Sequence, residues 1–308
     1  MKKIALFLLT VAYGITAAHA QLGSIDPGFL VGDAIEGVEP KVNAIELLPE
    51  GKMLIAGHFD TYDKAARKNI VRLNSDGSLD TAFVSLPDWR SNSYIYDICL
   101  QKDGKILLAG QFPNANGAQA IIRLESDGSI DTSFHDGSQL ANSIKAVAVQ
   151  EDGKILIGGK FSHYGGVLRY GIARLHPNGA IDTTFNTTGG GVGGGTGYEQ
   201  VNSIVLLPDG KSLIGGIFTK YNGATQKNLA RILENGRIDS TFISGTGVAG
   251  LVNAIALYPD GRIFIAGDFT QINGVGRQRV ARLKANGLID STFNPALFTP
   301  YASISGAN

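Results

Sequence analysis

The sequence predicts an all-β protein built from tandem repeats, and three observations support this prediction. Short apolar runs of strand length recur along the chain, tight glycine-containing turns separate them, and no useful length of helical periodicity follows residue 20. Glycine accounts for 41 of the 308 residues, but it recurs at fixed positions instead of being scattered as in a low-complexity chain. This regular spacing is the main evidence for the fold.

At the N-terminus, residues 1–20 are typical of a signal peptide. Two lysines precede an apolar stretch from Ile4 to Thr16, and residues 18–20 fit a small-x-small cleavage site. The stretch is shorter than the roughly 20 apolar residues of a membrane-spanning helix, and no later segment approaches that length. We therefore expect a secreted or periplasmic protein without a membrane span, whose mature chain starts near Gln21.

A Gly-x-Leu/Ile-Asp-x-x-Phe signature defines the repeat. Its copies are separated by 54, 51, 51, 57 and 51 residues. They begin at Gly23, Gly77, Gly128, Gly179, Gly236 and Gly287. Six signatures at nearly constant spacing enclose five complete repeats.

The sequence between two signatures has three parts. A first apolar run leads into an acidic-Gly-Lys/Arg turn, a second run of the Leu-Ile-Ala-Gly-x-Phe type follows, and an Ala-Arg-Leu-like third run comes after a longer polar loop. Pro208 and Pro259 begin Pro-Asp-Gly turns, in which proline presets the first corner and glycine takes the positive-φ position. The second runs end at Phe59, Phe112, Phe161, Phe218 and Phe269, which we expect to pack blade on blade. Each repeat is therefore predicted to form a four-stranded antiparallel unit whose fourth strand is short.

Such a unit cannot bury its apolar face alone, so the repeats must stack. Three or four short strands per period of about fifty residues are typical of β-propeller blades, and a linear β-solenoid is the alternative. The predicted blades cover residues 30–83, 84–134, 135–185, 186–242 and 243–293. We expect the spare signature at residues 23–29 to close a five-bladed ring near the C-terminus. In a six-bladed arrangement, the tail through Ile304 would start a sixth blade instead.

Three motifs follow one another in the repeat: Pro-Asp-Gly-Lys-x-Leu-Ile-x-Gly-x-Phe, then Ala-Arg-Leu, then Asn-Gly-x-Ile-Asp-Ser-Thr-Phe. Together they resemble the delta-60 repeat β-propellers of bacteria. The resemblance covers residues 23–293. It implies a secreted or surface propeller of bacterial origin, and it implies no particular activity.

Charge and cysteine content exclude several classes of function. Lysine plus arginine and aspartate plus glutamate number 27 each, which gives no electrostatic basis for binding nucleic acid. Cys99 is the single cysteine and lies in an apolar run, where a buried and inert thiol is expected. We expect a monomer without a cofactor.

An arginine precedes the signature aspartate by eight residues in every repeat. Around a short hairpin this spacing places the two side chains opposite one another, which predicts a structural ion pair in each blade. The pairs are Arg72 with Asp80, Arg123 with Asp131, Arg174 with Asp182, Arg231 with Asp239, and Arg282 with Asp290. The alternative is a calcium loop at Asn74-x-Asp76-Gly77-x-x-Asp80, but an arginine stands where another carboxylate would be needed, so no metal is predicted.

Residues that break the repeat are the candidates for function. If the tight turns share one face, the variable loops share the other, and exposed aromatic residues there suit a sugar ring or a peptide. The candidate ligand-binding residues are Trp89, Arg90, Tyr94, Tyr96, His163, Tyr164 and Tyr170, with Tyr198 beyond a glycine run. The alternative for Tyr62, Tyr164 and Tyr221 is repeat-related loop packing.

We find no catalytic motif, so the sequence favours a secreted binding or structural module for a carbohydrate or protein ligand. Gly189-x-Gly191-x-x-Gly194 opens no helix and is interpreted as an insertion, not a dinucleotide site. The alternative is a polysaccharide-active glycoside hydrolase or lyase that uses Glu46 and Asp97 on the first strands. A plain structural spacer is a third hypothesis.

Overall fold

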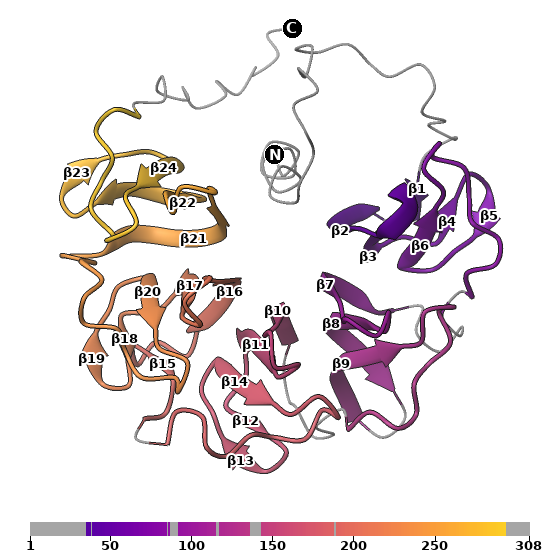
Figure 1. Ribbon diagram of the computed structural model, residues 1–308, viewed down its shortest axis with the longest axis horizontal. Coiled ribbons are helices and arrows are strands. Elements are labelled where there is room, and N and C mark those ends of the chain that lie inside the picture. Colours follow the sequence, from indigo (N-terminus) through magenta and orange to yellow (C-terminus); the bar gives the residue numbers. More distant parts are fainter. Residues whose placement is uncertain are drawn as a thin grey trace, which may run out of the picture.

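The computed structural model describes residues 35–37, 39–84, 86, 92–114, 117–135, 143–187 and 189–293. Five main antiparallel sheets form the blades, and Figure 1 shows the blades in sequence order around a common centre. The predicted all-β propeller class is confirmed. The signal peptide, the segment 23–29 and the tail beyond residue 293 lie outside the described residues.

Each blade has three main strands, and the first strand is innermost (Figure 1). Blade 1 contains β2 (Lys41–Leu47), β3 (Met53–His58) and β6 (Ile70–Leu73), and blade 2 contains β7 (Tyr94–Leu100), β8 (Ile106–Asn114) and β9 (Gly117–Leu124). Blade 3 contains β10 (Ser143–Val149), β11 (Ile155–Lys160) and β14 (Ile172–Leu175), and blade 4 contains β16 (Gln200–Leu206), β17 (Ser212–Ile217) and β20 (Leu229–Ile232). Blade 5 contains β21 (Val248–Leu257), β22 (Ile263–Ile272) and β24 (Val280–Leu283).

Two-residue strands form small hairpins at the outer rim of the blades (Figure 1). They are β4 (Thr61–Tyr62) with β5 (Ala65–Ala66), β12 (His163–Tyr164) with β13 (Val167–Leu168), β18 (Lys220–Tyr221) with β19 (Ala224–Thr225), and β23 (Val275–Gly276) paired with β22. Before two of the inner strands, β1 (Ile35–Glu36) and β15 (Val192–Gly193) add to these hairpins, and one 3-10 turn covers Pro49–Gly51. The loops between the second and third strands therefore fold back against their own blades.

The fourth strand, predicted to be short, is reduced to one bridge. In the described residues it is a single antiparallel bridge in each blade, such as Leu73 with Leu79. The chain then turns through the signature aspartate toward the next blade, because the aspartate accepts hydrogen bonds from the arginine side chain and from the backbone that follows the bridge. The signature is therefore a connector between blades more than a strand.

The hydrophobic core lies between blades. Leu54 and Ile70 of blade 1 form one cluster with Ile95 and Leu108 of blade 2, and Phe83 belongs to that same cluster. The clusters between blades 2 and 3, 3 and 4, and 4 and 5 are built alike, with Phe134, Phe185 and Phe242 in the place of Phe83. One blade alone would expose half of each cluster, which explains why the repeats must stack.

Side chains of the inner strands form hydrogen bonds with backbone groups of the neighbouring inner strand. Every inner strand has a β-bulge near its start, and residues at the bulge bond to the next blade. Asn43 Nδ2 donates to the Ile95 carbonyl at 2.7 Å, and Asn202 Nδ2 donates to the Val252 carbonyl at 3.1 Å. These bonds occupy edge groups that have no partner strand.

Among the described residues, no helix is long and apolar enough to cross a membrane.

Candidate ligand-binding face

The tight turns gather at one end of each blade. The two turns of blade 1 are adjacent, because a Cβ atom on Gly51 would lie 3.2 Å from the Ser75 side chain, and the same pairing recurs between Gly153 and Pro177 in blade 3 at 3.4 Å. Since β11 starts at the tight turn and ends at Lys160, Lys160 lies at the opposite end of blade 3. The variable loop that follows Lys160 therefore lies on the face opposite the tight turns.

The structural ion pairs stand away from that face. Arg174 Nε donates to Asp182 Oδ2 at 2.8 Å, both side chains are buried, and Arg174 also reaches the Glu234 carbonyl of the next blade at 2.6 Å. The other four arginines bond their aspartates at 2.7 or 2.8 Å. Each arginine also lies over the signature phenylalanine of its own blade. Among the residues the structure describes, no group of three or more histidine, cysteine, aspartate or glutamate side chains could hold a metal ion.

The structure separates the candidate ligand-binding residues. Trp89 and Arg90 lie outside the described residues. Tyr164 is 1% exposed, and its hydroxyl donates to the Gly179 carbonyl at 3.0 Å, a contact that Tyr62 and Tyr221 repeat with Gly77 and Gly236. Tyr164 is therefore loop packing and does not belong to an exposed surface. His163 is exposed, and its Nδ1 lies 3.0 Å from Ser162 Oγ.

Tyr94 and Tyr96 already have aromatic partners. The ring centroids of His58 and Tyr94 are 4.1 Å apart with nearly parallel planes, and Tyr94 stacks on Tyr96 at 6.5 Å. Lys145 of blade 3 places its ammonium 3.1 Å from the centre of the Tyr96 ring. The His58 ring also bonds to the Ser93 carbonyl at 3.1 Å, and because a carbonyl can only accept, Nδ1 is the donor. This stack ties blades 1, 2 and 3 together, and Tyr94 remains 38% exposed beside it.

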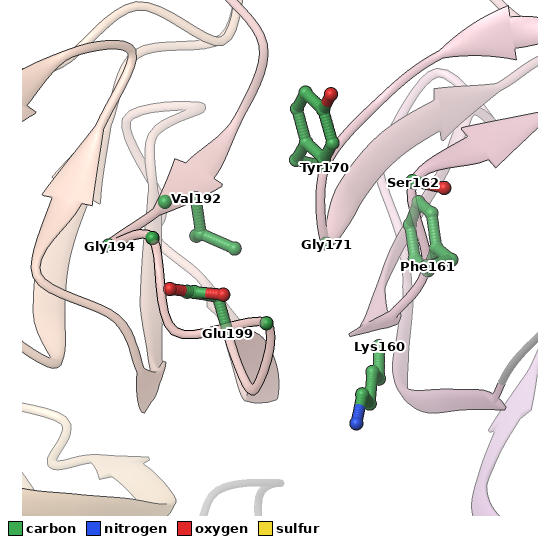
Figure 2. A pocket seen from close by; sticks show the side chains of 11 residues that line it. Lys160, Phe161, Ser162, Tyr170, Gly171, Val192, Gly194 and Glu199 are labelled. Carbon is green, nitrogen blue, oxygen red and sulfur yellow. The ribbon is translucent and has the colours of Figure 1, made fainter.

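A groove lies between blades 3 and 4, with a cavity volume of about 380 Å³. Figure 2 shows its two walls: Lys160, Phe161 and Tyr170 stand on one side, and Val192, Gly194 and Glu199 stand on the other. The lining also includes Ser162, Gly171, Gly193, Gly195 and Gly197. Tyr170 is the one residue of the candidate set that the groove contains.

The second wall is made by the insertion that lengthens this repeat. The spacing from Gly179 to Gly236 is 57 residues against 51 for the next repeat, a difference of six. In blade 5 the chain continues from Val248 into the inner strand as one strand, whereas in blade 4 the strand breaks after Gly193 and resumes at Gln200. The extra residues lie at this break, and Gly194, Gly195 and Gly197 among them line the groove, so this wall depends on the insertion.

Tyr170 forms an aromatic surface at the groove. It occupies the place of Lys68, Lys227 and Gln278 in other repeats, and it is 43% exposed. Its amide donates to the Gly190 carbonyl at 2.6 Å, and its carbonyl accepts from Val192 at 2.9 Å, so the insertion is bonded to the tyrosine backbone. A Cβ atom on Gly190 would stand 2.9 Å from the tyrosine ring, so only glycine allows the backbone to lie this close.

Two charged side chains line the groove. Lys160 Nζ lies 5.1 Å from the centre of the Tyr198 ring, and Tyr198 is 68% exposed. Glu199 Oε1 accepts from the Thr196 amide at 2.7 Å and from its hydroxyl at 3.0 Å. Burial opposes ionisation, but these hydrogen bonds hold the pKa of Glu199 below its ordinary value, so the carboxylate is charged. The groove therefore offers a cation, a carboxylate and an aromatic ring within one concave surface.

Sequence reasoning did not select Lys160 or Glu199. The position of Lys160 holds a different residue in each blade, namely His58, Gln111, Ile217 and Asp268 in the others, so the repeat gives no signal there. Lys160 and Tyr170 come together within blade 3, where the Gly171 amide donates to the Phe161 carbonyl at 2.8 Å. Glu199 lies in the insertion, and its proximity to both depends on the path of the insertion, which the sequence pattern does not reveal.

Glu46 and Asp97 occupy different positions in the inner strands. Glu46 is opposite Leu54 in its sheet and corresponds to Cys99, whereas Asp97 is opposite Ala109 and corresponds to Ala44. Asp97 accepts hydrogen bonds from the amides of Ile98 at 3.0 Å and Val147 at 2.8 Å.

Burial governs the ionisation of this inner-strand region. It raises the pKa of Asp97 to about 7 and raises the pKa of Glu46, and it raises the pKa of the Cys99 thiol to about 12. Because Asp97 accepts the hydrogen bond of the Val147 amide, it caps the edge of the neighbouring inner strand. Cys99 is half-buried and not fully buried as expected, while its raised pKa agrees with an inert thiol.

The fold and its interfaces define the chain as a β-propeller. The chain belongs to the β-propeller family described as a domain of unknown function, DUF5122, which matches residues 48–83, 101–134, 150–185, 207–242 and 259–293. This match confirms the expected β-propeller repeat family, although it does not carry the delta-60 name. No curated protein matches the sequence.

Solved structures with a similar fold include three bacterial proteins. A protein of unknown function from Bacteroides caccae has 13% identity and a TM-score of 0.45, with 81% of this chain and 80% of that chain covered. A gluconolactonase from Xanthomonas campestris has 13% identity and a TM-score of 0.46, with 78% and 71% covered. A virginiamycin B lyase from Staphylococcus aureus has 18% identity and a TM-score of 0.43, with 78% and 68% covered. Likeness at this level carries no information about activity.

Proposed function

We propose that the chain is a secreted binding module that holds a carbohydrate in the groove between blades 3 and 4. The single observation that carries this proposal is the convergence of Tyr170, Lys160 and Glu199 on one cavity that the insertion creates. All three differ from the residues at the equivalent places in other blades, so the repeat itself does not require them.

The chemistry of the groove suits a sugar ring. An exposed aromatic ring such as Tyr170 provides an apolar face against which the C–H groups of a sugar can stack. Lys160 can donate hydrogen bonds to hydroxyl oxygens, and the ionised Glu199 can accept from hydroxyl groups through Oε2. A cavity of about 380 Å³ falls within the range of small-ligand sites.

The inner-strand acids Glu46 and Asp97 lie at a different place in the fold, and neither lines the groove. Both carboxylate oxygens of Asp97 accept backbone hydrogen bonds, which gives this residue a structural role. Because a general acid and base must reach a substrate, the enzyme hypothesis needs a separate site on the inner strands.

The test is binding of the full chain to an array of glycans, followed by two variants on each hit. Tyr170→Ala removes the aromatic surface and should weaken binding at least about tenfold, the equivalent of about 1.4 kcal/mol. Gly193→Gln should fill the groove, because Gly193 lines it. The backbone should tolerate the change, because a Cβ atom at this glycine meets nothing within 4 Å and the conformation is not left-handed. It should abolish binding without unfolding the protein.

Gly276→Gln is the control, since Gly276 lies on the outer hairpin of blade 5, away from the groove, and its Cβ would also meet nothing within 4 Å. It should bind as the parent does. Equal loss in both glycine variants, or full binding by both groove variants, would remove the groove as the site. Release of a cleaved sugar during the assay would favour the enzyme hypothesis, and silence across the array would favour a protein ligand.

A further inference from the structure

Four of the blade interfaces are complete in the described residues, and blade 1 presents one half of a fifth. Phe59, Tyr62, Val71 and Leu73 form a cluster with Met53 and Ile55, and all its described members belong to blade 1 and the strand that precedes it. The equivalent faces of blades 2 to 5 are each covered by the preceding blade and its signature phenylalanine. Val71 is nonetheless fully buried and Phe59 is 2% exposed. A further segment must therefore cover this face.

The complete interfaces show what such a segment has to supply. The signature phenylalanine of one blade lies against the turn glycine of the next: a Cβ atom on Gly179 would be 2.8 Å from the Phe134 ring, and one on Gly236 would be 2.8 Å from the Phe185 ring. The residue after the phenylalanine then donates its amide to the carbonyl before that glycine. These bonds join Val84 to Asp127, His135 to Asn178, Asn186 to Asn235, and Ile243 to Asn286, each at 2.8 Å.

We propose that residues 23–29 dock on the open face of blade 1, with Phe29 against Gly77 and the amide of Leu30 on the carbonyl of Asp76. Phe29 precedes Gly77 by 48 residues, and the same interval is 45, 45, 51 and 45 in the four complete interfaces. Gly77 has φ of 86°, within a few degrees of the other turn glycines, so its turn is ready to receive a phenylalanine ring. Residues 23–29 are thus an integral part of blade 1, which needs them as blade 2 needs Phe83.

Blade 5 presents the opposite half-interface, and a separate observation identifies its occupant. Ala266 and Val280 are half-buried, whereas the equivalent Ala56 and Ile70 of blade 1 are fully buried. In complete interfaces this face is covered by two apolar residues three apart on the next inner strand: a Cβ atom on Gly215, the blade-4 equivalent of Ala266, would lie 2.6 Å from Val252 and 3.0 Å from Ile255.

The tail carries the same pattern of two apolar residues that enclose a small residue. The inner-strand copies are Val42-Asn-Ala-Ile45, Ile95-Tyr-Asp-Ile98, Ile144-Lys-Ala-Val147, Val201-Asn-Ser-Ile204 and Val252-Asn-Ala-Ile255, and the tail reads Tyr301-Ala-Ser-Ile304. The geometry points to residues 301–304 as the segment that covers blade 5, with Tyr301 and Ile304 toward Ala266.

Disulfide trapping tests the blade 1 contact in the full chain. Cys99→Ala supplies the background, because Ala148 and Ala256 occupy the equivalent positions. Leu30→Cys with Asp76→Cys should form an intrachain disulfide as efficiently as Val84→Cys with Asp127→Cys, whose amide-to-carbonyl bond is 2.8 Å. Leu30→Cys with Asp127→Cys should form none. A disulfide between two chains would assign the face to a second copy and overturn the proposal, as would free thiols in the test pair.

Thiol accessibility tests the blade 5 contact. Ala266→Cys should react slowly with a maleimide, and adding Ile304→Asp should raise its rate toward that of an exposed thiol, whereas adding Ala302→Asp should not. Ala56→Cys, at a fully buried position, provides the protected reference. Fast labelling of Ala266→Cys with the native tail, or equal effects of the two aspartates, would overturn the assignment.

Discussion

Phe83 of blade 1 lies against Gly128 of blade 2 so closely that a Cβ atom on the glycine would be 3.0 Å from the ring and 2.6 Å from the Val84 carbonyl oxygen. Gly128 also has φ of 92°. The contact joins a signature phenylalanine to a tight turn across the blade interface, and it recurs at the other complete interfaces. Glycine is thus required here both by backbone conformation and by space.

Gly128→Ala should therefore lower the free energy of unfolding by about 2 kcal/mol or more, from left-handed strain plus displacement of the phenylalanine ring. Urea unfolding followed by fluorescence measures this loss. Gly166→Ala is the matched control, because Gly166 also has positive φ, at 77°, but its Cβ would meet nothing within 4 Å. If the two variants lose equal stability, the interblade contact contributes nothing.

The buried ion pairs should be costly to break. Arg174→Met leaves the buried Asp182 carboxylate without its guanidinium and removes the bond to Glu234, so we expect a loss of about 3–5 kcal/mol in the free energy of unfolding. Lys211→Met removes a partly exposed ammonium 3.3 Å from Asp239 and should cost much less, because solvent screens an exposed pair. Similar losses in the two variants would show that burial does not set the strength of these pairs.

Acid should destabilise the fold through the signature aspartates. The Lys52 ammonium, with help from the Ala82 amide and Arg72, holds the pKa of Asp80 at about 2, below its ordinary 3.8, despite partial burial. A depressed folded-state pKa gives stability that is present above pH 4 and is lost as pH falls toward 2. Lys52→Met should shift the titration of the Asp80 carboxyl upward by NMR and flatten the loss of stability over that window. An unchanged Asp80 titration would exclude Lys52 as its main partner.

Asp97 should have the opposite effect on pH dependence. Its pKa is raised by burial to about 7, so the folded state binds a proton that the unfolded state releases near pH 4. The free energy of unfolding should therefore fall as pH rises from 4 to 7. Glu46, whose pKa is also raised, contributes with the same sign.

Asp97→Ser should reduce this slope. Ser203 fills the equivalent place in blade 4 and accepts the Ile255 amide at 3.1 Å, as Asp97 accepts the Val147 amide. The serine variant should keep the interblade hydrogen bond without a titrating group. Urea unfolding at several pH values compares the two proteins, and an undiminished slope in the variant would assign the pH dependence to other groups.

Much of the fold could be predicted from the repeat. The three strand runs, the tight turns at glycines and the eight-residue spacing of Arg72 and Asp80 all involve residues close in sequence, where periodicity and turn chemistry fix the geometry. The fourth strand was predicted only as short, and it is a single bridge at Leu79, because the pattern does not show where the chain leaves the sheet for the next blade. The site was predicted less well: Tyr170 lines the groove, but Tyr164 is buried and Lys160 was not selected.

The sequence by itself determined the repeat unit, its strands and turns, and the all-β class, because each rests on local alternation and short-range pairing. Only the tertiary structure decided that the core lies between blades and that Lys160, Tyr170 and Glu199 share one groove. The physical reason is that contacts between blades join residues about fifty positions apart. The repeat places equivalent residues alike, but the path of an insertion that occurs once has no repeated pattern to reveal it.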